Sequence, residues 1–210
     1  MAGQYDFEEQ ERIAEIRHWW EDNAKFVYAA VAALVLGVGG WRGWQYWTGV
    51  QAEEAAALVA ELPKAKGDAK KIGDTAQLAM DRYPSSFFAS EAALASAQAS
   101  FEAGDLATAR ARLEWVLKNG RAEHVGIARI RLAAVLLDLK KYPEALETLE
   151  AGKDEAFAAL AADLRGDVLF AQGRNDEARA AYKLALDKSD ARSPMRAVTE
   201  LKLGALGGAQ

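Results

Sequence analysis

Residues 160–186 read LAADLRGDVLFAQGRNDEARAAYKLAL, and this stretch decides the fold. It consists of an Ala- and Leu-rich segment, a short polar turn at Gly173 and a second segment of the same kind. Two related stretches precede it, residues 91–117 and 127–151. Their turns fall at Gly104 and Lys140, so the three turns lie 36 and 33 residues apart. The sequence therefore predicts an internal repeat of helix pairs with a period of about 34 residues.

Small residues recur in step within the three copies. The second segments carry Ala109, Ala145 and Ala178, each followed one helical turn later by a larger residue, Leu113, Leu149 or Tyr182. The first segments carry Ala97, Ala133 and Gly166 at one equivalent position. Small residues let two helices approach closely, and stacked pairs bury faces that a single pair leaves open. The pattern predicts an all-α, tetratricopeptide-repeat-like solenoid of about three to four helix pairs with a C-terminal capping helix, whose main repeat domain covers residues 91–210. A generic antiparallel helical bundle is the alternative.

The sequences on either side of the repeats predict caps for the solenoid. Upstream, residues 48–90 form a helical connector and an atypical N-terminal repeat, with a helix over 69–82 that ends before Pro84. Downstream, Ser193 precedes Pro194 as a helix N-cap does, and residues 195–206 form a capping helix. Such helices cover the last apolar face of a solenoid.

A second feature is the apolar stretch FVYAAVAALVLGVGGWRGWQYW at residues 26–47, in which Arg42 is the one charged residue. A helix of this length rises about 33 Å, which is enough to cross a bilayer core of about 30 Å. Aromatic residues gather at its C-terminal end, where amphipathic rings favour the headgroup layer: Trp41, Trp44, Tyr46 and Trp47. The sequence predicts a single transmembrane helix in contact with membrane lipid.

A cleaved signal peptide is the alternative interpretation of this stretch. Residues 1–25 are long and acidic, with seven Asp and Glu against Arg12, Arg17 and Lys25, and the apolar run ends in Trp and Arg. A secretory signal has a short basic region and a small-residue cleavage site, so an uncleaved anchor fits better. The basic residues before the span favour a cytoplasmic N-terminal tail and a C-terminal domain outside, which in a bacterium means the periplasm.

The composition argues against several classes of function. The chain has no cysteine, so disulfides, cysteine metal sites and thiol nucleophiles are excluded. Residues 48–210 carry 22 basic and 24 acidic side chains, a net charge of −2 without a basic cluster, which argues against nucleic acid. The two histidines, His18 and His124, lie far apart and have no catalytic partners nearby in sequence. We expect no catalytic, cofactor-binding or metal-binding residues and no enzymatic activity.

Binding of a partner polypeptide is the function that the repeats suggest. In a stacked solenoid the first helix of each pair lines the inner face. Positions ten, six and three before each turn share one side of that helix: Leu94, Gln98, Phe101, Ile130, Ala134, Leu137, Asp163, Asp167 and Phe170. These groove candidates are mainly apolar, with an acidic patch at one end. They either form an open surface for a partner segment or pack against the neighbouring helices.

Gly39 and Gly43 are the candidate residues within the span. They lie four apart, on one face of a helix, where missing side chains allow a second transmembrane helix to approach closely. Such spacing is common in membrane helices, so the packing role is one of two interpretations.

Three stretches give the chain a resemblance to a known family. They are residues 20–25 before the span, LGVGGWRGWQYW at residues 36–47, and ADLRGDVLFAQGRNDEARAAY at residues 162–182. In these the chain resembles the YfgM-like ancillary subunits of the bacterial Sec translocon, single-span inner-membrane proteins with a periplasmic tetratricopeptide domain. The resemblance runs nearly end to end, and the Asp-Leu-Arg-Gly core is its most specific part.

The resemblance implies partners as well as a fold. It implies association with the translocon channel and with a membrane-anchored periplasmic chaperone of the prolyl-isomerase type, and a part in handing over newly exported client proteins. It brings no catalytic residues. The alternative is a membrane-anchored assembly scaffold for another envelope complex, such as outer-membrane biogenesis or cell division.

Overall fold

The computed structural model describes the backbone of residues 3–62, 65, 67–152 and 154–207, and side chains from residue 12 onward. Within these ranges the regular secondary structure is entirely helical. The helices are α1 Gly3–Val59, α2 Ala69–Arg82, α3 Phe87–Glu102, α4 Leu106–Asn119, α5 Ala122–Asp138, α6 Tyr142–Glu150, the short 3-10 helix η2 Glu155–Phe157, α7 Ala158–Ala171, α8 Asn175–Lys188 and α9 Pro194–Ala205. The predicted all-α fold is confirmed.

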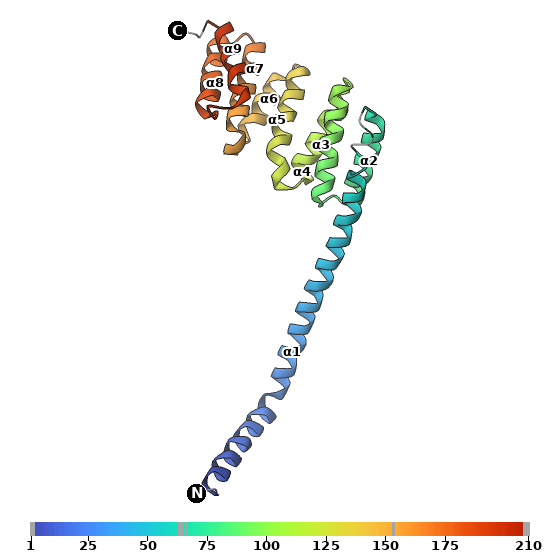
Figure 1. Ribbon diagram of the computed structural model, residues 1–210, viewed down its shortest axis with the longest axis vertical. Helices are drawn as coiled ribbons and strands as arrows, with labels where there is room; N and C mark the ends of the chain where they lie inside the picture. The colour runs from blue at the N-terminus through green and yellow to red at the C-terminus, as the bar shows by residue number, and fades with distance from the viewer. Residues whose placement is uncertain (1–2, 63–64, 66, 153, 208–210) are drawn as a thin grey trace. The chain divides into compact units, whose positions relative to one another are not determined.

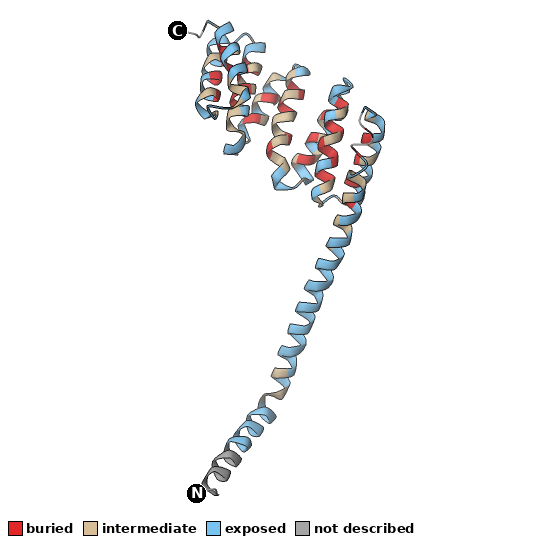
Figure 2. Cartoon of the chain, in the orientation of Figure 1, coloured by how far each residue is buried: buried red, intermediate tan, exposed pale blue. Residues whose placement is uncertain are grey.

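The chain divides into two compact units, Met1–Val50 and Gln51–Gln210. In the first unit α1 is a single helix, and none of its residues 12–50 is buried (Figure 2). The part of α1 with described side chains, Arg12–Val59, is long and apolar enough to cross a membrane. A helix that exposes apolar side chains all round is stable in lipid rather than in water.

The second unit is a stack of antiparallel helices that follow one another in chain order from α2 to α9 (Figure 1). It begins with the last turns of α1, where Ala55 is fully buried and Glu54 accepts a 2.6 Å hydrogen bond from the Tyr83 hydroxyl. That hydrogen bond to a carboxylate raises the pKa of Tyr83. α2 matches the helix expected over 69–82, and the Asp68 side chain caps it by accepting from the Lys71 amide at 2.9 Å.

The three repeat turns share one backbone conformation. Gly104, Lys140 and Gly173 have φ angles of 80°, 58° and 75°, in the left-handed region. Their amides donate to the carbonyls of Phe101, Leu137 and Phe170 at 2.8–2.9 Å, and the amide after each turn residue reaches back five residues. This is the Schellman ending of a helix, which favours glycine because a side chain is strained there. Lys140 adopts the same conformation, so the local geometry repeats even where the residue type does not.

The small residues of the repeat lie where two helices meet. Ala109, Ala145 and Ala178 are each fully buried. One turn later in each second helix comes a buried larger residue, Leu113, Leu149 or Tyr182. Gly166 on α7 faces Tyr182 on α8 so closely that a Cβ atom at Gly166 would overlap the tyrosine ring. In each second helix, the small residue and the larger residue one turn later, which the sequence pattern indicated, are therefore both buried in the packing of the repeat.

The capping helix α9 closes the end of the stack. It begins after Ser193 with Pro194 in its first turn, as expected, although the Ser193 side chain makes no capping hydrogen bond. Leu203 on α9 packs into a cluster with Leu169, Ala178 and Tyr182. The cap therefore covers α7 and α8 through the same residues that hold that pair together.

The contact between Gly166 and Tyr182 generates a stability prediction. We expect Gly166→Ala to destabilise the repeat domain by about 1–3 kcal/mol through overpacking, because the Tyr182 ring that it would meet is buried and its hydroxyl is bonded to Asp167. This loss exceeds the gain of about 1 kcal/mol that alanine brings over glycine inside a helix. Urea unfolding of the full chain in detergent, followed by circular dichroism, measures the difference.

A second background makes this prediction specific. Tyr182→Leu recreates the pairing of the first two repeats, where Ala97 and Ala133 precede Leu113 and Leu149. In that background Gly166→Ala should become neutral or stabilising. An equal loss in both backgrounds would show that the Gly166–Tyr182 contact does not limit the packing.

Candidate functional site

Three helices, α3, α5 and α7, carry the groove candidates. α3 lies against α5 and α5 against α7, so their surfaces adjoin. We name the surface the first-helix face and define it by the nine positions derived from the repeat: Leu94, Gln98, Phe101, Ile130, Ala134, Leu137, Asp163, Asp167 and Phe170.

These nine side chains differ widely in exposure. Phe101 is 37% and Phe170 54% exposed, and Gln98 is exposed as well. Half-buried members are Ile130, Ala134, Leu137 and Asp167. Leu94 and Asp163 are buried. Binding by the exposed members stays a prediction. Leu94 is buried in a core cluster with Met80, Leu113 and Val116, so at this position the alternative of packing against neighbouring helices holds.

The acidic patch at the end of the face is an internal network. Asp163 accepts from the Thr199 hydroxyl at 2.7 Å and from the Lys202 ammonium at 2.7 Å. Asp167 accepts from the same ammonium at 2.8 Å and from the Tyr182 hydroxyl at 2.9 Å. Both carboxylates are therefore bonded to α8 and α9. They tie the cap to the last repeat, as in the alternative in which the groove candidates pack against the neighbouring helices.

The network shifts the pKa of its basic and phenolic members. Burial alone lowers the pKa of Lys202, but its hydrogen bonds to Asp163 and Asp167 outweigh burial, so the pKa is raised. Burial, with the hydrogen bond to the Asp167 carboxylate, raises the pKa of Tyr182. Lys202 therefore stays charged and Tyr182 neutral near pH 7, so both keep the protons that they donate to the network.

A hollow of ≈ 180 Å³ opens between the first two repeats, and we name it the α3–α5 hollow. Its lining consists of Ala97, Gln98, Phe101, Leu113, Arg131, Ala134 and Val135. Three members of the first-helix face, Gln98, Phe101 and Ala134, thus surround one depression. Its walls are apolar except for the Gln98 amide and the Arg131 guanidinium.

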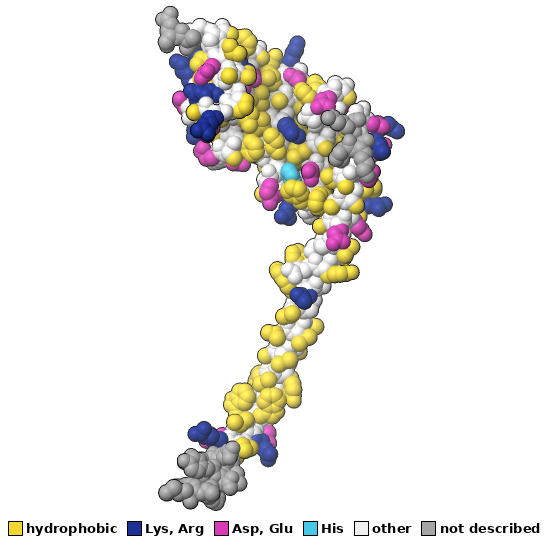
Figure 3. All heavy atoms as spheres, viewed as in Figure 1, with side chains coloured by type: hydrophobic (Ala, Val, Ile, Leu, Met, Phe, Trp, Pro, Cys, Tyr) yellow, Lys and Arg dark blue, Asp and Glu magenta, His cyan; other side chains and the backbone are white. Residues whose placement is uncertain are grey.

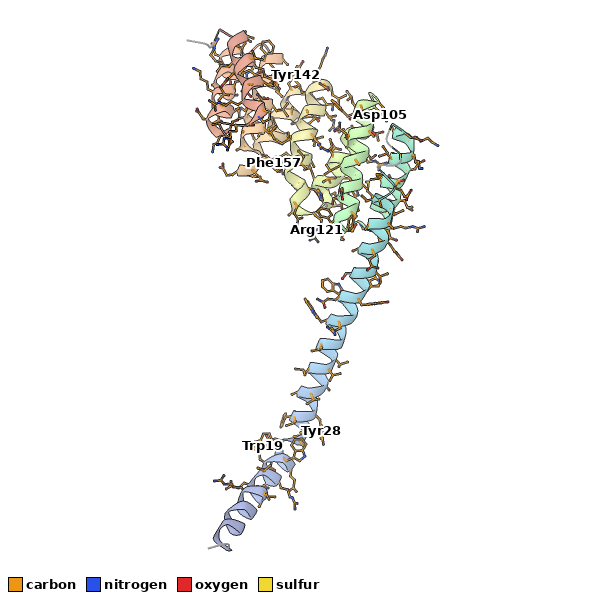
Figure 4. All side chains as sticks on the ribbon, in the orientation of Figure 1. Trp19, Tyr28, Asp105, Arg121, Tyr142 and Phe157 are labelled. Atoms are coloured by element: carbon orange, nitrogen blue, oxygen red, sulfur yellow. The ribbon has the colours of Figure 1, made fainter. Side chains whose placement is uncertain are left out.

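A second hollow of ≈ 250 Å³ lies between the second and third repeats, and we name it the α5–α7 hollow. Its lining consists of Gly126, Arg129, Ile130, Leu149, Gly152, Asp154, Glu155, Phe157, Ala158 and Ala161. Phe157 on η2 points toward α5 (Figure 4), and a Cβ at Gly126 would overlap its ring. Two carboxylates line this hollow, of which Asp154 caps η2 and Glu155 pairs with Lys188 at 3.2 Å.

The membrane span presents aromatic residues near both of its ends. Trp41 and Trp44 contact each other with ring centroids 5.5 Å apart. Near the N-terminal end, Trp20 meets Tyr28 edge to face at 5.7 Å; Figure 4 labels Tyr28 and the neighbouring Trp19. The 28-residue step from Trp19 to Trp47 rises about 42 Å, which matches a bilayer with its headgroup layers. Space-filling atoms show hydrophobic side chains along this length (Figure 3).

Gly39 and Gly43 lie in the exposed part of this helix. A Cβ at either position would meet no atom within 4 Å. The helix itself does not require these glycines for packing, and their surface is open to another helix. Their packing role remains a prediction.

The described residues give no sign of a metal centre. Among them no group of three or more His, Cys, Asp or Glu side chains could hold a metal ion. His124 packs its ring against Phe87 with the centroids 4.5 Å apart.

Several residues of these surfaces escaped the sequence reasoning. Arg129 and Arg131 interrupt the apolar α5 sequence, and this interruption was the available signal. Trp19 and Trp20 precede the predicted span by less than two turns, a position typical of interfacial aromatics. No sequence feature indicated that Phe157 lines a hollow, because η2 lies outside the repeat pattern.

Comparison with known proteins relates the whole chain to one family. Residues 17–208 match the family described as tetratricopeptide repeat-like domain. The ancillary SecYEG translocon subunit of Neisseria gonorrhoeae is 33% identical over 203 residues, covering 95% of this chain and 97% of the relative. Proteins of the same name from Haemophilus influenzae and Escherichia coli are 30% and 28% identical, covering 86% and 94% of this chain and 90% and 96% of the relatives.

A solved structure supports the fold independently. The structure titled "MamA RS-1 ArsTM double mutant" superposes with a TM-score of 0.58 at 22% identity. It covers 75% of this chain and 83% of the other chain. At this identity the likeness concerns the fold alone.

The exposure of the first-helix face generates a prediction about which of its residues are surface. The double variant Phe101→Glu with Phe170→Glu should keep the melting temperature of the repeat domain, because both rings already reach solvent. The matched variant Leu94→Glu should lower the melting temperature by on the order of 10 °C, since it buries a carboxylate without a partner. Circular dichroism of the full chain in detergent measures both.

The same double variant tests binding. If the first-helix face holds partner polypeptide, crosslinked partners should disappear from the double variant while it stays folded and anchored. Unfolding of the double variant would assign both rings to the core. Undiminished capture would move the binding surface elsewhere on the chain.

Proposed function

We propose, from the premise that this chain belongs to the tetratricopeptide repeat-like family of ancillary SecYEG translocon subunits, that it associates with the Sec translocon in the inner membrane. In this proposal α1 anchors the protein by a single span, and the repeat domain binds polypeptide without enzymatic activity. The observation that carries the proposal is the similarity along nearly the full length of relatives with this name. It includes both the span and the repeats.

The structure of each unit supports a part of this proposal. The first unit presents an apolar helix whose side chains are free to contact lipid or other membrane helices. The second presents an apolar face with the partly exposed rings of Phe101 and Phe170 at the ends of two first helices. Exposed apolar surface in a folded domain is typical of sites that bind other chains.

The finer proposal concerns what the repeat domain does outside the membrane. We propose that it binds a membrane-anchored periplasmic chaperone of the prolyl-isomerase type, and that the pair receives newly exported client proteins. The resemblance of residues 162–182 supports this proposal. In the structure this stretch forms most of α7 and the first half of α8, next to the cap.

Crosslinking within the membrane tests the association with the translocon. A photo-reactive amino acid at Gly39 or Gly43 should give adducts with the membrane subunits of the translocon, because these positions are open and share one face. Gly37 is the matched control, since it is also an open glycine but points away from that face. Adducts are identified by mass spectrometry of the purified complexes.

Two results would contradict the proposal in different ways. Adducts only with subunits of another envelope complex would reject association with the translocon and favour the alternative, an assembly scaffold for that complex. Equal yields from Gly37, Gly39 and Gly43 would remove the assignment of a packing face.

The orientation of the chain is a separate prediction. Arg12, Arg17 and Lys25 before the span, against Arg42 at its exit, favour a cytoplasmic N-terminus. Protease added to spheroplasts should digest residues 51–210 and leave an N-terminal fragment that the membrane protects. A repeat domain that resists protease until the membrane is broken would reverse the orientation.

A further inference from the structure

The α3–α5 hollow combines a single free cation with apolar walls. Arg131 lines it, and among the described residues no side chain forms an ion pair or hydrogen bond with its guanidinium. Two arginines on the preceding helix behave differently: Arg110 pairs with Glu114 at 2.7 Å and with Glu144 at 3.0 Å, and Arg112 bonds to Gln77 at 2.5 Å. The lining of the hollow includes no carboxylate. Its charge is therefore not neutralised by its own walls.

The hollow also offers a hydrogen-bond acceptor. The Gln98 amide donates through Nε2 to Glu102 Oε1 at 2.6 Å. This bond fixes the orientation of the amide and leaves its Oε1 without a donor among the described residues. An extended peptide backbone has amide donors of this kind at regular intervals.

The size of the hollow suits one side chain. A cavity of about 150 Å³ holds a benzene molecule, and the α3–α5 hollow measures ≈ 180 Å³. Its apolar walls include Ala97, Leu113 and Val135, with the ring of Phe101 at the edge. A leucine- or phenylalanine-sized group would displace water from these walls.

We propose that the α3–α5 hollow binds an extended polypeptide in which an apolar side chain is followed by an aspartate or glutamate. The apolar side chain enters the hollow and the carboxylate pairs with Arg131. The Gln98 Oε1 atom accepts a hydrogen bond from a backbone N–H of the peptide. The inference rests on the proposed function, because it names the kind of polypeptide that the repeat domain recognises. Nucleic acid does not fit, since residues 48–210 carry a net charge of −2 and the lining has one cation.

The α5–α7 hollow shows why the assignment is specific. It also contains an arginine, Arg129, and an aromatic ring, Phe157, but its lining includes the carboxylates of Asp154 and Glu155. An incoming carboxylate would meet like charge there. Arg129 is therefore the matched control for Arg131, two residues away on the same helix.

Peptide binding to the full chain in lipid nanodiscs tests the proposal. Three labelled octapeptides share a Ser/Gly background and one leucine, which is followed by aspartate, asparagine or lysine. Fluorescence anisotropy should give a dissociation constant about tenfold lower for the aspartate peptide than for the asparagine peptide, and the weakest binding for lysine. The aspartate preference should shrink as salt is raised.

Two variants locate the preference. Arg131→Gln should bind the aspartate and asparagine peptides equally, whereas Arg129→Gln should keep the tenfold difference. Equal binding of these two peptides by the unaltered chain would overturn the proposal, and this comparison does not depend on how a variant folds. A preference that survives Arg131→Gln, or that Arg129→Gln also removes, would overturn it as well.

The same nanodisc experiment is paired with the Gly39 crosslink in cells. Translocon adducts without an aspartate preference would overturn the peptide inference and leave the proposed function standing. Absence of translocon adducts would overturn the proposed function, whatever the peptides show.

Discussion

The close approach of the two helices in each pair is the constraint on which the repeat domain depends. Ala109, Ala145 and Ala178 are fully buried, so no larger residue fits at these positions without moving a helix. The size limit is strictest in the last pair, because the Tyr182 ring leaves no room for a side chain at Gly166 opposite it. With the pairs held at this distance, the three turns adopt one conformation, and the first helices lie side by side with one face outward.

That constraint also explains where the charged residues go. A tyrosine in place of leucine at the third pair brings a hydroxyl into the packing, and Asp167 accepts its hydrogen bond at 2.9 Å. The buried Asp163 then shares the Lys202 ammonium with Asp167, and α9 is held by charge as well as by Leu203. Breaking one partner of such a network leaves the others unpaired, which is costly in a partly buried site. The Asp-Leu-Arg-Gly stretch on α7 therefore helps to join the last repeat to the cap.

The sequence predicted what is local and missed what depends on distant partners. The helix over 69–82, the three turns and the capping helix follow from turn residues, prolines and small residues a few positions apart. Asp163 and Asp167 were placed on their helix, but their hydrogen bonds were not predicted, because their partners Thr199 and Lys202 lie 35 to 39 residues away. The α3–α5 hollow is lined by residues of three helices, so the interruption of the apolar α5 sequence at Arg131 could not by itself show that this side chain lines a hollow.

The membrane span lowers the affinity that the first-helix face needs for binding a partner at the same membrane. A hollow that takes one side chain, with one ion pair and one amide acceptor, gives weak binding by itself, because ordering an extended peptide offsets much of the gain. An anchor alters this balance: holding a domain and its partner at the same membrane raises their effective concentration into a range where weak contacts are occupied. Weak contacts also release quickly, since affinity differences lie mainly in dissociation rates. For a protein that hands polypeptides onward, as proposed, a shallow hollow on an anchored chain is a better solution than a deep pocket on a free one.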